Sequence, residues 1–165
     1  VWTAENTNPR GLTGTLRAAL AGADVFIGVS APNVISGDDV ATMADDSIVF
    51  AMANPSPEVD PDEAAKHAAI VGTGRSDFAN QINNVLAFPG VFRGLIDARS
   101  SKVTEPLLLA AAKALAAVIH EDELNPTYIV PSVFNPEVTT LVAAAVEATA
   151  RAEAEADAAA AATSA

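Results

Sequence analysis

Three short apolar runs lie in the first half of the chain, and each one stops at a residue that favours a turn. The runs cover residues 24–31, 47–53 and 69–73. They end, in that order, before Pro32, Asn54 and Gly74. Apolar residues are nearly continuous within each run and do not alternate with polar ones. This pattern is typical of strands that are buried on both faces of a parallel sheet.

Four helix starts are marked by capping residues. Ser36 stands three residues before the carboxylate of Asp39, and Asp60 is followed by a proline at the first helical position and then by Glu63. Thr104 opens a helix that should run to about residue 118, and Asn135 opens the last helix. In that last helix one face collects Val138, Leu141, Val142, Ala145, Val146 and Thr149.

The alternation of strands with helices predicts an α/β layered domain with a parallel sheet. The chain has 165 residues, which fits one domain because domains usually have about 100–200 residues. We assign residues 1–150 to that domain. Residues 151–165 alternate Ala with Glu and Asp and end in nearly pure Ala, so we expect a helical or disordered tail there.

Composition excludes several classes of partner. The formal net charge is −12, and an acidic surface repels both nucleic-acid phosphates and anionic lipid headgroups. No apolar run reaches the roughly 18–20 residues that a membrane span needs. The chain has no cysteine, which removes disulfides and thiolate chemistry and agrees with a cytoplasmic location. We therefore expect no nucleic-acid partner and no membrane partner.

Asparagines are concentrated in the segments that follow the predicted strands. In an open α/β sheet, ligands bind in the crevice beyond the carboxyl ends of the strands. A neutral amide can donate to a carboxylate and accept from a hydroxyl, which suits a small polyoxygenated acid or a ribose. The alternative is that these residues form Asx turns and helix caps. The residues concerned are Asn54, Asn80, Asn83 and Asn84.

Other candidate motifs favour ordinary structural roles. Gly72 and Gly74 follow the third run, but position 77 is Asp where a dinucleotide fingerprint needs its third glycine. We therefore interpret this segment as a turn. His67 lies on the short helix after Asp60, among Ala and Lys, and His120 follows a helix end; a solvated surface position is the better interpretation of both. Pattern and spacing thus predict a polar, amide-rich sheet edge without defining a reaction.

Three segments resemble the malic enzymes, especially the short bacterial type. They are residues 22–33, residues 50–58 with the sequence Phe-Ala-Met-Ala-Asn-Pro-Ser-Pro-Glu, and residues 73–90, the most specific of the three. Ser56 replaces a more usual Thr of that family, and Ala79 replaces a frequent Pro. The resemblance covers about residues 5–150. It implies the second half of a Rossmann-like, three-layer nucleotide-binding domain with a parallel sheet, followed by C-terminal helices.

The family oxidises malate with NAD or NADP and a divalent metal, and it decarboxylates the product to pyruvate. Carried over by position, the resemblance implies substrate binding by Asn54, Asn83 and Asn84. It also implies that Ser30, Ala31 and Asn54 line the cofactor cleft.

The family's catalytic Tyr and Lys, its metal-binding carboxylates and its glycine fingerprint all lie upstream of the matched segments. The resemblance therefore places no catalytic residue and no metal ligand in this chain, and it implies that Mg or Mn is bound by residues outside it. We expect the chain alone to be inactive and to act with an N-terminal catalytic half, in a polypeptide that forms a homodimer. The alternative is a stand-alone, non-catalytic α/β module for nucleotide binding or assembly.

Overall fold

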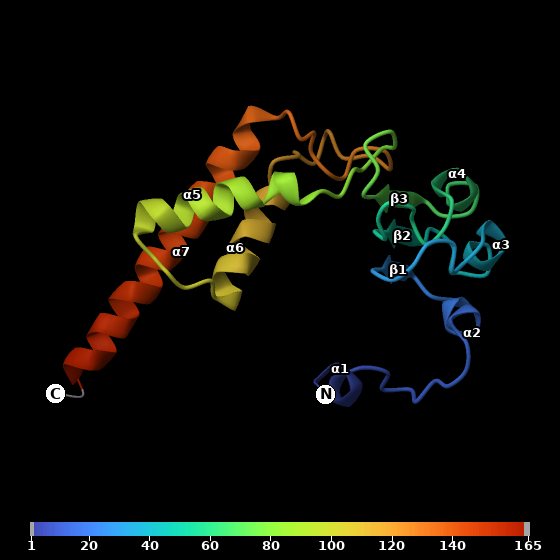
Figure 1. Cartoon of the computed structure of the whole chain (residues 1–165), viewed down its shortest axis with the longest axis horizontal. Helices are drawn as coiled ribbons and strands as arrows, with labels where there is room; N and C mark the ends of the chain where they lie inside the picture. The colour runs from blue at the N-terminus through green and yellow to red at the C-terminus, as the bar shows by residue number, and fades with distance from the viewer. Residues whose placement is uncertain (1, 164–165) are drawn as a thin grey trace. The chain divides into compact units, whose positions relative to one another are not determined.

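The computed structural model describes residues 2–163, and the chain divides into two compact units (Figure 1). Unit 1 comprises Val1–Ala79, and unit 2 comprises Asn80–Ala165. Each unit has its own apolar core. No helix within residues 2–163 combines the length and the apolar composition that a membrane span requires.

Unit 1 contains a parallel sheet of three strands in the order β1-β2-β3. The strands are β1 (Val25–Gly28), β2 (Ile48–Ala51) and β3 (Ile70–Thr73). Residues Val25, Ile48 and Ile70 are paired across the sheet at one end, and Gly28, Ala51 and Thr73 at the other. The predicted strands and their parallel arrangement are therefore confirmed. The helices of this unit are α1 (Trp2–Asn6), α2 (Leu16–Leu20), α3 (Gly37–Val40) and α4 (Pro61–Ala64).

One face of this sheet forms the core of unit 1. The core combines strand residues such as Phe26 and Val49 with Leu20, Val40 and Ala64 from α2, α3 and α4. Successive residues of a strand point to opposite faces, and the other face of β1 is open. There Val25, Ile27 and Val29 are 47%, 62% and 77% exposed. The expectation of burial on both faces is therefore wrong for β1, because the helices of unit 1 cover one face only.

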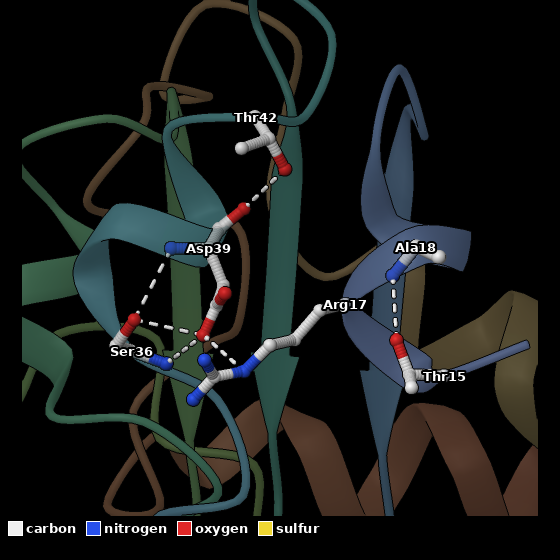
Figure 2. A network of polar contacts seen from close by, with 6 residues as sticks. All are labelled: Thr15, Arg17, Ala18, Ser36, Asp39 and Thr42. Atoms are coloured by element: carbon white, nitrogen blue, oxygen red, sulfur yellow. Dashed lines mark hydrogen bonds and ion pairs between the residues drawn. The ribbon is translucent and has the colours of Figure 1, made fainter.

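Local capping explains where the short helices of unit 1 begin. Ser36 Oγ accepts a hydrogen bond from the amide of Asp39, and Asp39 Oδ2 accepts one from the amide of Ser36 in return. The Asp39 carboxylate also meets Arg17 Nε of α2 at 3.4 Å (Figure 2). Asp60 Oδ1 accepts from the amides of residues 62 and 63 at the start of α4. Both caps predicted from the sequence are confirmed.

Unit 2 is helical. It comprises the short 3₁₀ helix η1 (Asn84–Leu86), α5 (Phe88–Ala98), α6 (Glu105–Ala116) and α7 (Pro136–Thr163). The helices α5 and α6 both pack on α7 (Figure 1). The capping positions Thr104 and Asn135 are as predicted, since Thr104 accepts from the amide of Leu107 and Asn135 from that of Glu137.

The helix α7 continues without a break to Thr163, so residues 151–163 of the expected tail are helical. Residues 164 and 165 lie outside the described part of the chain. The core of unit 2 is made of aliphatic side chains from its helices and the loops between them. Its buried members are Leu86, Val91, Leu95, Leu107, Ala111, Val118, Val138, Val142, Val146 and Ala150.

Two glycines allow α5 to approach α7 closely. A Cβ atom on Gly90 would lie 2.6 Å from Val142 Cβ, and one on Gly94 would lie 2.5 Å from the carbonyl oxygen of Ala143. Both distances are shorter than side-chain atoms tolerate. Because Gly90 and Gly94 have no side chain, α5 can lie this close to α7.

Candidate functional site

The carboxyl ends of β1 and β2 carry three of the residues that the sequence singled out. Ser30 and Ala31 follow the end of β1, and Asn54 follows the end of β2. Because the two strands are parallel and in register from Val25 to Gly28, these loops leave the sheet at the same edge. All three residues are exposed. Within residues 2–163 the side chain of Asn54 makes no hydrogen bond, so both ends of its amide are available to a ligand.

A buried carboxylate connects these two loops. Glu58 is 0% exposed. Its Oε1 accepts from the backbone amide of Ser30 at 2.7 Å and from Ser30 Oγ at 3.3 Å. Its Oε2 accepts from the backbone amide of Ala53 at 2.9 Å. Each of these amides lies two residues beyond the last residue of its strand, so one side chain joins both strand ends.

The surroundings of Glu58 favour the ionised form of its carboxylate. Burial acts to raise the pKa of Glu58, since it removes the charge from water. Hydrogen bonds from the amides of Ser30, Ala53 and Glu58 itself and from the Ser30 hydroxyl together outweigh that effect and lower the pKa below its ordinary value of 4.5. No Lys or Arg of residues 2–163 forms an ion pair with it. Backbone and hydroxyl donors alone therefore stabilise this negative charge.

Gly28 provides the space for this carboxylate. A Cβ atom at position 28 would lie 2.5 Å from Glu58 Cδ and 2.7 Å from Glu58 Oε1. A larger residue at the end of β1 would therefore force either the carboxyl group or the strand to shift. The sequence interpretation did not single out either residue. The available signal was a glutamate set between Pro57 and Val59, at the end of the family-like segment 50–58.

The loop after β3 forms a self-contained turn. Arg75 donates to both carboxylate oxygens of Asp77, at 2.9 and 2.5 Å. Its guanidinium also lies 4.7 Å from the centre of the Phe78 ring. The hydrogen bond from Arg75 is the main cause of a lowered pKa at Asp77. This geometry agrees with the interpretation of the segment as a turn.

Asn83 and Asn84, the two remaining candidates, lie at the start of unit 2. Asn83 Oδ1 accepts from the amide of Val85 at 3.1 Å and caps η1. Its carbonyl therefore has a local partner, while its NH₂ group can still donate. Asn84 is exposed and its side chain makes no hydrogen bond within residues 2–163. Of the two side-chain amides, that of Asn84 is therefore the one without a hydrogen-bond partner in the described residues.

Asn80 has a structural role. Its side chain is buried, and Nδ2 donates to the carbonyl of Pro126 while Oδ1 accepts from the amide of Ile129, both at 2.8 Å. It connects the loop before η1 to the loop before α7. Of the four asparagines that the sequence grouped together, Asn80 is therefore a buried link, and Asn54, Asn83 and Asn84 are exposed.

The described residues offer no metal centre. No group of three or more His, Asp or Glu side chains within residues 2–163 could hold a metal ion. Glu58, whose carboxylate contacts the loops after β1 and β2, is buried and already accepts three hydrogen bonds. Asp77 is paired with Arg75. These carboxylates do not fit a role as ligands of a divalent cation.

The parallel sheet and its polar strand-end loops place the protein in the class of Rossmann-like α/β folds. A family model described as "Malic enzyme, NAD binding domain" matches residues 6–151. The chain therefore belongs to the malic enzyme family, and the matched part is the NAD-binding domain of that family.

Individual relatives agree with this assignment. The chain is 58% identical to the NAD-dependent malic enzyme of Geobacillus stearothermophilus over 87% of this chain and 30% of the relative. It is 48% identical to the bifunctional malic/malolactic enzyme of Bacillus subtilis over 87% of this chain and 35% of the relative. The chain thus spans about a third of the length of these relatives.

Solved structures give the same result for the fold. The malic enzyme of Pyrococcus horikoshii superposes with a TM-score of 0.85 at 44% identity, over 93% of this chain and 36% of that one. The NAD-dependent malic enzyme of Thermotoga maritima gives a TM-score of 0.83 at 44% identity, over 88% and 38%.

Proposed function

We propose that this chain supplies the cofactor- and substrate-binding part of a malic enzyme, which converts malate to pyruvate by oxidative decarboxylation and reduces NAD or NADP. The observation that carries the proposal is that the family match covers the loops on which the candidate site residues stand. The family model covers residues 6–151, and the exposed residues Asn54, Ser30 and Ala31 stand on two loops that leave the sheet at one edge and are joined by Glu58.

The site residues have chemistry that matches malate and a dinucleotide. Malate carries two carboxylates and one hydroxyl, and an amide can donate to the former and accept from the latter. We assign these contacts to Asn54, Asn83 and Asn84. Ser30 and Ala31 line the cofactor cleft through their backbone, together with Asn54. When bound, the dinucleotide supplies the hydride acceptor.

The catalytic groups come from another part of the polypeptide in this proposal. That part contributes the acid, the base and the ligands of a divalent metal such as Mg or Mn. The open face of β1 supports the existence of such a part, because Val25, Ile27 and Val29 form an exposed apolar strip on a strand paired on one side only. The 165 residues alone are then inactive. The homodimer and the cytoplasmic location stay predictions.

A non-catalytic binding or assembly module is the second candidate function. The observation in its favour is that each unit of this chain has its own buried core. Such a module would retain the strand-end amides for nucleotide binding without turning over malate. The two candidates differ in whether NAD(P)H forms, which makes them separable in one assay.

The test begins with the intact mass of the natively expressed polypeptide. We expect a mass well above the 16.8 kDa of this chain. The purified protein is then mixed with malate, Mn²⁺ and either NAD⁺ or NADP⁺, and absorbance and pyruvate are followed. Malate-dependent formation of both NAD(P)H and pyruvate supports the enzyme. A native mass of 16.8 kDa with dinucleotide binding and no turnover supports the module.

A control separates a missing catalytic part from a misfolded sample. The 165-residue chain is expressed alone, and its helix content is checked by circular dichroism before the same assay. A folded chain that oxidises malate by itself would overturn the assignment of the catalytic groups to another part.

A further inference from the structure

We infer that Glu58 is a positioning residue for this site: its buried carboxylate fixes the loops after β1 and β2 so that Ser30 and Asn54 face a common ligand. The inference deepens the proposed function and rests on it. It starts from a group that the sequence patterns did not single out, a glutamate that is 0% exposed and lacks a cationic partner within residues 2–163.

Burying such a group is unfavourable unless it is well hydrogen-bonded. Glu58 meets that condition by dividing its two oxygens between the two loops. Oε1 binds the amide and hydroxyl of Ser30, and Oε2 binds the amide of Ala53. A hydrogen bond to an ionised acceptor is stronger than a neutral one. The two loops are therefore joined through one rigid, charged group.

The backbone of the same segment is anchored as well. The carbonyl of Glu58 accepts from the amide of Ile35, and the carbonyl of Pro57 accepts from that of Asn33, at 3.2 and 3.0 Å. Val59, the next residue, is buried in the core of unit 1. The main chain of Glu58 is thus held in place independently of its side chain. The side chain can therefore fix the positions of the two strand ends that it contacts.

The position of the two amides argues for a role in the site. Ala53 directly precedes Asn54, whose amide is exposed and free of protein partners in the described chain. Ser30 is the cofactor-lining residue at the end of β1. Glu58 itself is inaccessible to solvent, so it acts on a ligand only through these neighbours. Small displacements at such positions matter, since a misplacement of about 1 Å can cost about 10²-fold in rate.

Glu58→Gln in the full-length protein tests the inference. The substitution keeps the size of the side chain, but it replaces one acceptor oxygen by an NH₂ group that faces another N–H donor. Glu63→Gln is the matched control, because Glu63 is an exposed glutamate of the same unit whose ion pair within residues 2–163 is with Lys66. Readouts are the melting temperature, the Kd for NAD(P)H from its fluorescence, and kcat and KM for malate below the melting temperature of every variant.

We expect Glu58→Gln to raise the Kd for NAD(P)H and lower kcat/KM for malate by about ten-fold or more per folded molecule. Glu63→Gln should stay within about two-fold on both, as a surface change. A lowered melting temperature with unchanged Kd and kcat/KM would show a purely structural role and overturn the inference. If Glu58→Gln does not fold, Glu58→Asp, which keeps the charge on a shorter arm, takes its place with the same expectation. If neither variant folds, the positioning role is also overturned.

The readouts separate this inference from the proposed function. A wild-type protein that binds NAD(P)H but does not oxidise malate contradicts the proposed function, while the Kd still decides the role of Glu58. A wild-type protein that oxidises malate, with an unaffected Glu58→Gln variant, contradicts only the positioning role. A wild-type protein that neither binds NAD(P)H nor oxidises malate contradicts both.

Discussion

The two units of this chain differ in the structure that supports their exposed polar residues. In unit 1, Ser30 and Asn54 stand on loops after strands of four residues each, and a single buried carboxylate connects the loops. In unit 2, Asn83 and Asn84 stand at the start of η1, next to helices of 11, 12 and 28 residues that pack around an aliphatic core.

The difference shows where each unit should be sensitive. Aliphatic packing is spread over many side chains and does not depend on protonation. The stabilising effect of a hydrogen-bonded carboxylate depends on its charge and on the positions of a few atoms. We therefore expect the stability of unit 2 to fall mainly when buried side-chain volume is removed. The stability of unit 1 should depend more on pH and on small steric changes at the strand-end loops.

The largest expected effect is the loss of packing in unit 2. Leu107 is 1% exposed on α6, while the adjacent Leu108 is 53% exposed. Leu107→Ala should lower the free energy of unfolding by about 2–5 kcal/mol, because it removes buried methyl groups and leaves a cavity. Leu108→Ala is the matched control and should change it by about 0.5 kcal/mol at most. Urea denaturation of the full-length protein measures both, and equal effects would contradict the described core.

A smaller loss is expected from a single added methyl group in unit 1. Gly28→Ala places a Cβ where Glu58 Cδ lies 2.5 Å away, and such overpacking costs about 1–3 kcal/mol. A double-mutant cycle provides the control. If the cost comes from contact with the carboxyl group, it should shrink in a Glu58→Ala background. An unchanged cost in that background would mean that Gly28 is needed for another reason.

The pH dependence of stability should distinguish the two units further. Because its hydrogen bonds lower the pKa of Glu58 below 4.5, the ionised group contributes stability above its unfolded pKa. That contribution is lost as the pH falls through the lower, folded pKa. Denaturation between about pH 6 and pH 3 should therefore show a steeper acid loss for the wild type than for Glu58→Gln. Parallel pH profiles would contradict an ionised Glu58.

The smallest expected effect concerns Ser47, which precedes β2. Its Oγ is buried and has no hydrogen-bond partner in the described chain. Because an unsatisfied buried hydroxyl is unfavourable, Ser47→Ala should be neutral or stabilising by up to about 1 kcal/mol. Ser101→Ala, at an exposed position, is the control and should have no effect. A destabilisation by Ser47→Ala above about 1 kcal/mol would indicate a partner for this hydroxyl.

The elements that the sequence predicted are those with strong local signals. The three strands follow from apolar runs that end at turn residues, and the helix starts follow from caps such as Ser36 and Asp60. The helix α5 was not predicted, because it carries Gly90 and Gly94, which weaken a helix locally. Its close packing on α7 stabilises it in the fold. That contact joins residues far apart in the chain, and no local pattern reports it.

The candidate site divides in the same way. Asn54, Asn83 and Asn84 could be proposed from amide chemistry at strand ends and from the family resemblance. Nothing local separates them from Asn80, whose partners Pro126 and Ile129 lie far along the chain. The role of Glu58 likewise depends on Gly28 at the end of β1 and on Ser30 in the loop after it. Tertiary partners, and not residue types, decide which polar side chains stay exposed and which support the fold.

The most direct test of this account compares malate kinetics of Asn54→Ala and Asn84→Ala with the wild type in the full-length protein. Both amides are exposed, so the melting temperature should change little. We predict malate-dependent NAD(P)H formation by the wild type, and a kcat/KM for malate lower by about 10²-fold in each variant. Wild-type kinetics in both variants would contradict the central claim that these amides contact the substrate.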